Sequence, residues 1–127
     1  MIAIDTSALI AVLAREPLGP ACESALLENE LVISAGTLTE ALIVASSMNL
    51  LPAMTALLDS LEPEIVDVTA AFAERASAGY RRWGKGFHPA RLNYGDCFSY
   101  AVAKAHDCPL LYVGDDFAKT DVVSALG

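Results

Sequence analysis

Acidic side chains occur at four places where a small α/β protein could use them in chemistry, either directly after an apolar segment or in the first turns of a helical one. These residues are Asp5, Glu40, Asp96 and the pair Asp115–Asp116. Carboxylates gathered at one place repel one another unless a cation neutralises them. Because hard oxygen ligands suit Mg²⁺ or Mn²⁺, these residues predict a divalent-metal site, provided that the fold brings them together.

The elements that must position these acids alternate between strand-like and helix-like segments. Short apolar runs predict buried strands at 1–5, 31–34, 64–68 and 109–113, with a short fifth strand at 121–122 and a helical end to the chain. Helical patterns fill the intervals at 6–14, 18–30, 37–48, 52–61, 69–83 and 94–106. This alternation predicts an α/β fold with a parallel sheet covered on both faces.

Ligands of such sheets bind at the carboxyl ends of the strands. Connections between parallel strands are right-handed, so Asp5, Glu40, Asp96 and Asp116 are expected to converge on one edge of the sheet. Thr6 and Ser7, which follow Asp5, are expected to hold its carboxylate or to cap the first helix.

Each acid also has a purely structural explanation. Asp5 can cap the first helix, and the sequence Thr37 to Glu40 has the form of a capping box. Asp96 suits the positive end of a helix dipole, and Asp115–Asp116 after a glycine is ordinary turn chemistry. Capping and metal binding are compatible, because a cap can orient a ligand.

Composition limits the class of protein. The 127 residues fit one domain, 1–127, and a hydrophobic fraction of 54% with a charged fraction of 19% favours a packed core over disorder. The net charge of −8 is the wrong overall sign for a nucleic-acid binder. No apolar run approaches the roughly 20 residues of a membrane span. The N-terminus has no basic leader, so a cytoplasmic location is expected. The three cysteines, Cys22, Cys97 and Cys108, have neither the number nor the spacing of a disulfide framework or a zinc site.

Four sequence blocks resemble those of a known family. They are IDTSAL at 4–9, TEAL at 39–42, LNYGDCFSYAVAK at 92–104 and LLYVGDDFAKTDV at 110–122. In this order and at these spacings the chain resembles PIN-domain ribonucleases, and among them the VapC-type toxins of bacterial toxin–antitoxin pairs. The resemblance runs over essentially the whole chain and implies a three-layer α/β/α fold with a parallel sheet of four to five strands.

The resemblance also implies roles for the acids. It makes Asp5, Glu40, Asp96 and Asp116 the catalytic set, with Asp5, Asp96 and Asp116 as metal ligands. Asp115 and Asp121 are accessory residues in this assignment, and Thr6 is a further accessory residue because it directly follows Asp5. The expected activity is Mg²⁺-dependent hydrolysis of RNA phosphodiester bonds, with Mn²⁺ as a substitute, and neither the RNA target nor the number of metal ions follows from the sequence.

Five of the eight basic residues fall between Arg75 and Arg91, although the chain as a whole is acidic. Tyr80, Trp83 and Phe87 lie among them. Arg81, Arg82, Lys85 and Arg91 are therefore candidates for RNA contacts, with the aromatic rings as a stacking surface. A solvated helix face and loop is the structural alternative.

Almost no charge appears between Glu40 and Asp59. Helices that are apolar nearly all round must be buried or must face another chain. The resemblance supplies two partners for that face, a second copy of the chain in a homodimer and a small antitoxin that lays a helix into an apolar groove. In this family the antitoxin can also direct a basic side chain at the acidic site.

Two other classes of function remain open from the sequence. A receiver-type phosphoacceptor domain is also a small α/β protein, but it needs paired acids after its first strand, where this chain has only Asp5; Asp67 would have to serve as its phosphoacceptor. A partner-binding module without catalysis would use the acids only structurally. A labile aspartyl-phosphate would indicate the first class, and RNA cleavage by purified protein would exclude the second.

Overall fold

One parallel sheet forms the centre of the molecule. The computed structural model describes all residues from Met1 to Gly127. Its strands are β1 (Ile2–Ile4), β2 (Leu31–Ser34), β3 (Glu64–Val66) and β4 (Leu110–Leu111), arranged in the order β3-β2-β1-β4 with every neighbouring pair parallel. The chain therefore moves from β1 through β2 to β3 on one side and returns to place β4 on the other side of β1.

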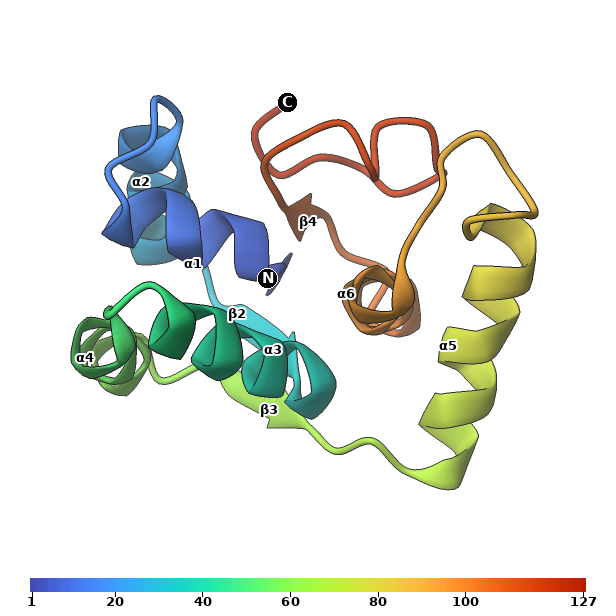
Figure 1. Cartoon of the computed structure of the whole chain (residues 1–127), viewed down its shortest axis with the longest axis horizontal. Helices are drawn as coiled ribbons and strands as arrows, with labels where there is room; N and C mark the ends of the chain where they lie inside the picture. Colours follow the sequence, from blue (N-terminus) through green and yellow to red (C-terminus); the bar gives the residue numbers. More distant parts are fainter.

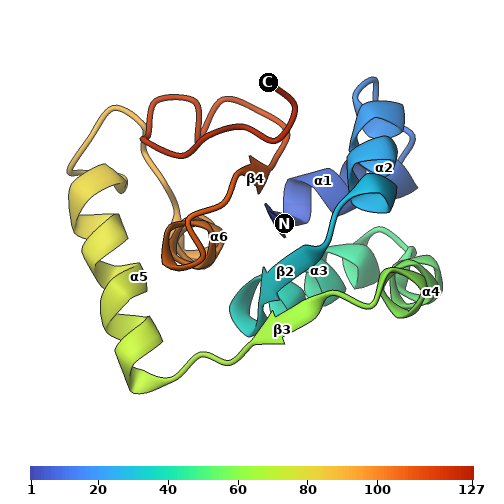
Figure 2. The same cartoon turned by 180° about the vertical axis from the view of Figure 1, so that it is seen from behind.

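Six helices cover the two faces of this sheet. They are α1 (Thr6–Leu13), α2 (Gly19–Glu28), α3 (Ala35–Ser47), α4 (Leu51–Leu61), α5 (Ala70–Trp83) and α6 (Tyr94–Ala105). Figure 1 and the view from behind in Figure 2 show α1, α2 and α4 on one side of the strands and α5 with α6 on the other. On that second side α6 packs against β1, β2 and β4, and α5 packs against α6.

Alternating side chains of the strands divide the core in two. Ile2, Ile4 and Ile33 pack with α1 to α4, whereas Ala3, Val32 and Leu110 pack with α5 and α6. This alternation follows from the period of two along a strand. The predicted three-layer α/β fold is thus confirmed.

Element boundaries agree with the sequence expectations to within a few residues, and Thr69 caps α5 as predicted, accepting a hydrogen bond from Phe72 N–H. The predicted fifth strand at 121–122 is wrong. Only a single bridge joins Leu110 to Ser124, so the sheet has four strands. The predicted helical end is also wrong, because the residues after β4 form turns and bends.

The predicted capping box at Thr37 is wrong as well. Helix α3 begins two residues earlier, and Ser34, the last residue of β2, caps it through Gly36 N–H. Thr37 is therefore inside the helix and fully buried. Because α3 starts earlier, Glu40 lies in its second turn and does not cap the helix. It contacts Thr6 of α1 instead.

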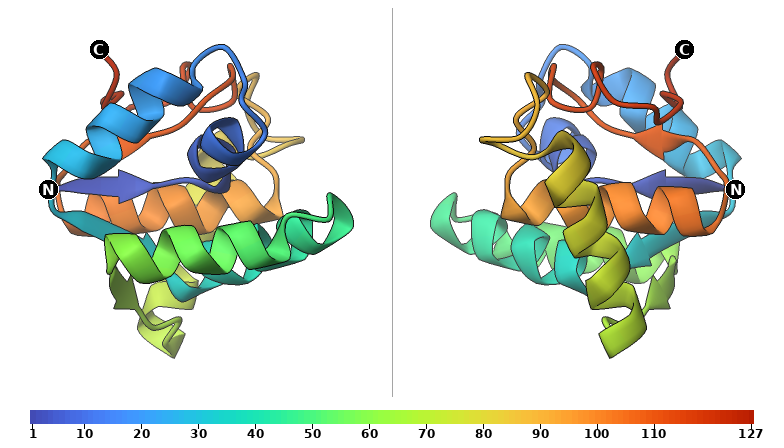
Figure 3. Two further views of the ribbon diagram at one scale, coloured as in Figure 1. Left: turned by 90° about the vertical axis from the view of Figure 1, so that its left-hand side faces the viewer. Right: turned by 90° about the vertical axis from the view of Figure 1, so that its right-hand side faces the viewer.

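The strand order reverses at β1, because its sequence neighbour β2 lies on one side and β4 on the other. Ligand sites of doubly wound sheets form where the order reverses, beyond the carboxyl ends of the strands. The two strands at this point stay paired beyond β1, since Asp5 N–H donates a 3.0 Å hydrogen bond to the Leu111 carbonyl. Figure 3 shows the compact packing of the helices around this sheet from two sides. None of the helices is both long and apolar enough to pass through a membrane.

Candidate active site

Asp5 follows β1 at the point of reversal, and it is 4% exposed. Its carboxylate caps α1 and accepts three hydrogen bonds. Oδ2 accepts from Ser7 N–H at 3.1 Å and from the Ser7 hydroxyl at 2.6 Å, and Oδ1 accepts from the Ser99 hydroxyl at 2.6 Å. Val113 N–H in turn donates to Ser7 Oγ at 3.0 Å. The residues around β1 and β4 therefore fix the orientation of this carboxylate.

The hydroxyl of Ser99 joins α6 and α3 to Asp5. Thr37 Oγ1 lies 3.1 Å from Ser99 Oγ. Ser99 has a single hydroxyl proton and donates it to Asp5, so Thr37 must be the donor in its contact with Ser99. Both hydroxyl-bearing residues are completely buried, and the chain of donors from Thr37 through Ser99 therefore ends at the Asp5 carboxylate and holds it in place.

Glu40, in the second turn of α3, faces the start of α1. The hydroxyl of Thr6 donates to Glu40 Oε1 at 2.7 Å. The carboxylate also lies directly against Gly95 of α6, where a Cβ atom would collide with it. Thr6 therefore holds a carboxylate, as the sequence suggested, but the carboxylate is that of Glu40 and not that of Asp5.

Asp96 is in the first turn of α6 and is 8% exposed. It forms a true capping box with Asn93, whose side chain accepts from Asp96 N–H while Asn93 N–H donates to Asp96 Oδ2 at 3.0 Å. Burial, and to a smaller degree the negative charges of three neighbouring acids, raises the pKa of Asp96 to about 7. The Asp96 side chain thus caps α6 and is also repelled by the neighbouring carboxylates.

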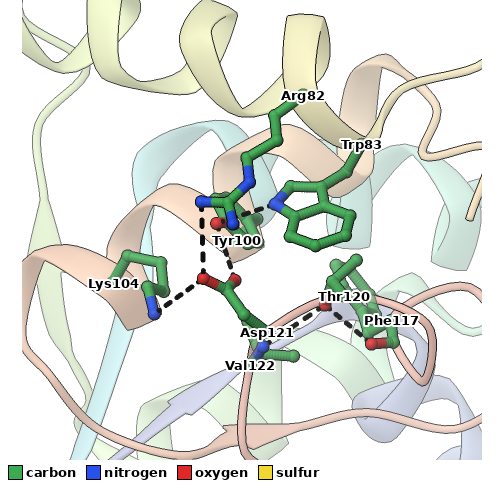
Figure 4. Close-up of polar contacts among 8 residues, drawn as sticks. All are labelled: Arg82, Trp83, Tyr100, Lys104, Phe117, Thr120, Asp121 and Val122. Atoms are coloured by element: carbon green, nitrogen blue, oxygen red, sulfur yellow. Dashed lines mark hydrogen bonds and ion pairs between the residues drawn. The ribbon is translucent and has the colours of Figure 1, made fainter. Parts of the chain in front are cut away.

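The remaining predicted acids lie in different places. Asp116, in the turn after β4, lines the same cavity as the three acids above, whereas its exposed neighbour Asp115 does not. Asp121 is also outside this cavity. It accepts a 2.7 Å hydrogen bond from the Tyr100 hydroxyl and lies 3.3 Å from Lys104 Nζ (Figure 4).

Asp121 belongs to a separate polar cluster on the outer side of α6. Arg82 lies 3.7 Å from it, and the indole N–H of Trp83 donates to the same Tyr100 hydroxyl (Figure 4). Burial opposes its ionisation, but the hydrogen bonds and positive charges around it lower the pKa of Asp121 below its ordinary value. Its observed contacts therefore link α5, α6 and the C-terminal segment, and they involve none of the four central acids.

The four central acids converge on one cavity of about 310 Å³ at the carboxyl edge of the sheet. It is lined by Asp5, Thr6, Ser7, Ile10, Glu16, Glu40, Val44, Asp96, Val113, Asp116 and Phe117. Glu16 was not predicted from the sequence, because it follows α1 and no strand end marks it. Its N–H returns to the Ala11 carbonyl at 2.9 Å, and this turn places the side chain at the cavity.

Sequence reasoning also missed Ser99 and Thr37. Helical spacing was the available signal, because residues three apart lie on one face of a helix. Ser99 is three residues after Asp96, and Thr37 is three residues before Glu40. Each therefore faces the same side as an acid that the sequence did identify.

The side chains that line this cavity include five carboxylates, which are ligands suited to a divalent cation. No three acidic, histidine or cysteine side chains are grouped closely enough in this conformation to hold a single ion. The chemistry of the set nevertheless fits a hard cation, because all the charged groups lining the cavity are carboxylates and their mutual repulsion helps to raise the pKa of Asp96.

The four basic candidates differ in what they contact. Arg81 donates to Ser77 Oγ at 3.1 Å, whereas Arg82 turns toward Asp121 and lies 4.6 Å above the Trp83 ring. Lys85 and Arg91 are exposed on the turns between α5 and α6. Trp83 is half-buried and Arg82 already covers its ring, so the ring is not free to stack on a base.

Comparison with known proteins agrees with this geometry. The PIN domain family model matches residues 2–123. A ribonuclease VapC of Mycolicibacterium smegmatis is 42% identical over 125 residues, covering 95% of this chain and 97% of the relative. Ribonuclease VapC30 of Mycobacterium tuberculosis is 41% identical over 126 residues, covering 95% of each chain.

Solved structures of low sequence identity share the fold. Mycobacterium tuberculosis VapC20, described as a toxin that cleaves the sarcin–ricin loop, superposes with a TM-score of 0.77 at 20% identity over 97% of each chain. A chain of a toxin–antitoxin complex from Klebsiella pneumoniae gives a TM-score of 0.71 at 23% identity over 98% of each chain. With four carboxylates at the edge expected for this fold, the chain belongs to the PIN-domain family, among the VapC ribonucleases.

Proposed function

We propose that this protein is a Mg²⁺-dependent endoribonuclease that acts as the toxin of a toxin–antitoxin pair. The observation that carries the proposal is the convergence of Asp5, Glu40, Asp96 and Asp116 on one cavity where the strand order reverses. The family and its curated ribonuclease relatives support RNA as the substrate.

In this proposal Asp5, Asp96 and Asp116 hold the metal. Bound Mg²⁺ supplies charge stabilisation at the phosphoryl oxygens and makes a bound water more acidic. Asp5 is the residue best prepared for this role, because its three hydrogen bonds fix its orientation. Asp96 is held by its capping box and brings a second carboxylate to the cavity from α6.

Glu40 is the residue that we assign to the attacking water. Thr6 anchors only Oε1, so Oε2 has no protein donor and can accept a proton from water. No nucleophilic side chain is needed, because hydrolysis by an oriented water requires only a proton acceptor and charge stabilisation.

The basic segment Arg75–Arg91 is proposed to contact the RNA backbone. Arg81, Lys85 and Arg91 are exposed, and the only ion pairs in the structure join Arg82 and Lys104 to Asp121. Phosphate contacts from free cations give an affinity that decreases steeply with salt.

Cleavage of RNA by purified protein tests the nuclease. Activity should be present with Mg²⁺ or Mn²⁺, absent with EDTA, and lost in Asp5→Asn. Asp115→Asn is a matched control, because this acid neighbours Asp116 but does not line the cavity. Activity that persists in chelator, or an Asp5→Asn variant that cuts normally, would contradict the proposed mechanism.

The toxin assignment has its own test. Expression of the chain alone should arrest growth, and co-expression of a small protein encoded beside it should relieve the arrest. Growth without arrest while purified protein remains an active nuclease would remove the toxin assignment and leave the nuclease standing.

We also propose that the protein is a homodimer that uses α3 and α4. The predicted exposure of apolar side chains on these helices is observed, since Ile43 is 64% exposed and Met48 and Leu51 are also open to solvent. A cavity of about 600 Å³ lies beside them, lined in part by Leu38, Leu42, Leu58 and Ile65. Apolar surface of this kind favours association.

A further inference from the structure

A second large groove lies between α5 and α6, outside the acidic cavity. Its volume is about 570 Å³. It is lined by Val68, Ala73, Ala76, Ser77, Tyr80, Arg81, Phe87, Tyr94, Cys97 and Phe98. Figure 3 shows in its right-hand view how α5 crosses over α6 and leaves the start of α6 beside the turn that follows α5.

Aromatic rings dominate this groove. Tyr94 and Phe98 meet edge to face with ring centroids 5.1 Å apart, and Tyr80 and Phe87 do the same at 5.9 Å. Tyr94 is 78% exposed and Phe87 is 62% exposed. Each pair therefore holds its exposed ring, that of Tyr94 or Phe87, in place while much of the ring surface stays open to solvent, as a stacking platform requires.

The charge of the groove distinguishes it from the one beside α3 and α4. Arg81 lines the aromatic groove, bonded to the neutral Ser77 hydroxyl and not to a carboxylate. The other groove combines aliphatic side chains with Asp59 and Glu62. A polyanion is attracted to the first and repelled by the second.

The aromatic groove and the proposed active site meet at the start of α6. Tyr94 and Asp96 share the first turn of α6, with Tyr94 in the groove and Asp96 in the acidic cavity. Between them, Gly95 lies against the Glu40 carboxylate. A single strand that crosses this turn would place one nucleotide at the acids and a neighbouring one at the rings.

We propose that this groove binds an unpaired nucleobase of the RNA, stacked on Tyr94 and Phe87, while Arg81 contacts the adjoining phosphate. The inference rests on the proposed RNA substrate and adds to it a requirement for single-stranded RNA beside the cut. Stacking tolerates different bases, because every base has an aromatic face.

Binding of short single-stranded RNAs that carry 2-aminopurine tests the site, because the fluorescence of this base is quenched when it stacks. Titrations in EDTA measure binding without cutting, and steady-state kinetics in Mg²⁺ give KM separately. The variants are Tyr94→Ala and Phe87→Ala, with Tyr94→Phe as the conservative change that keeps the ring. Leu27→Ala is the control, since this residue is equally exposed but lies on α2.

Wild-type protein should quench the fluorophore, and each alanine variant should raise Kd and KM by about 5- to 150-fold, the equivalent of one lost stacking contact. Tyr94→Phe should behave like wild type. Arg81→Ala should lower the salt dependence of binding by about one phosphate contact.

Three results would overturn the inference. The first is alanine variants whose Kd and KM match those of Leu27→Ala, and the second is a wild-type protein that quenches nothing in either EDTA or Mg²⁺. The third is an alanine variant that binds RNA as wild type does but whose toxicity is no longer inhibited by a co-expressed partner protein. That result would assign the groove to the partner. Quenching without any RNA cleavage would instead contradict the proposed nuclease and support the base site.

Discussion

The Ser99 hydroxyl donates a 2.6 Å hydrogen bond to Oδ1 of Asp5, a residue 94 positions away in the sequence. This bond ties α6 to the end of β1 and leaves Thr37 as the donor to Ser99. The orientation of the central carboxylate thus depends on a residue that has no charge and lies entirely in the interior.

Replacing Ser99 by Ala should therefore lower activity by about 10- to 100-fold, the usual effect of losing a partner that orients a metal ligand. Thermal or urea unfolding should show a loss of about 1–3 kcal/mol, because Asp5 and Thr37 each lose a buried partner. Ser47→Ala is the control, as its hydroxyl bonds only to the Val44 carbonyl at the exposed end of α3. Normal RNA cleavage and Mg²⁺ dependence in Ser99→Ala would show that Asp5 needs no such support.

The position of Glu40 can be tested without touching its carboxylate. A Cβ at Gly95 would collide with this side chain, so Gly95→Ala should push it off the Thr6 hydroxyl. Activity should decrease by about tenfold or more. The melting temperature should stay equal or rise, because Ala is favoured over Gly in a helix by up to about 1 kcal/mol.

A double-variant comparison identifies the cause of that loss. In a Glu40→Ala background the clash and the carboxylate are both absent, so adding Gly95→Ala should change activity no further. Equal losses from Gly95→Ala in both backgrounds would mean that the methyl group disturbs something other than Glu40.

Because the pKa of Asp96 is raised, the stability of the metal-free protein should depend on pH in a definite direction. Its folded-state pKa of about 7 lies above the ordinary value of 3.8, so the folded protein binds more protons than the unfolded chain between these limits. This contribution to stability is present below about pH 4 and is lost as the pH rises toward 7. Asp96→Asn keeps a cap for Asn93 N–H but cannot ionise.

Melting temperatures of wild type and Asp96→Asn, measured in EDTA at pH 4.5 and pH 7.5, test this sign. The melting temperature of Asp96→Asn, relative to that of wild type, should be higher at pH 7.5 than at pH 4.5. A constant difference would mean that the pKa of Asp96 is not raised in the folded protein.

How far the sequence predicts this structure depends on the range of the interactions involved. Strand ends and helix starts are local features, so Asp5, Asp96 and Asp116 were placed correctly at the carboxyl edge. The three-layer arrangement follows from alternating short apolar strands and helices, which is also a local pattern. The corrections to the fold concern the start of α3, where Ser34 displaced Thr37 as a cap, and the C-terminal segment, where a lone bridge replaced the fifth strand and turns replaced the helix.

Partners between distant segments were not predictable from one sequence. Thr6 was expected beside Asp5, its neighbour, but it bonds to Glu40 because α1 and α3 pack side by side. Asp121 was grouped with the acids because it lies in the block at 110–122 that carries the family resemblance. Its carboxylate instead meets Tyr100 and Lys104, which face it from one side of α6. Such pairings depend on how helices cross, and spacing along the chain does not encode that.

The exposed face of α3 and α4 leads to a prediction about assembly. Ile43 is exposed on α3, within the segment between Glu40 and Asp59 that carries no charged side chain, and an uncharged apolar face of this kind favours contact with another copy. Sedimentation velocity should show a dimer for wild type. Ile43→Glu should shift the protein to a monomer, since a carboxylate in an apolar interface is costly to desolvate.

Leu27→Glu is the matched control, because Leu27 is 72% exposed on α2, on a different surface. It should sediment as wild type does and keep its melting temperature to within a few degrees, because Leu27 is not buried in the protomer. A wild-type protein that remains a monomer at high concentration would remove the dimer. If Ile43→Glu and Leu27→Glu both stayed dimeric, the dimer would use a surface other than α3 and α4.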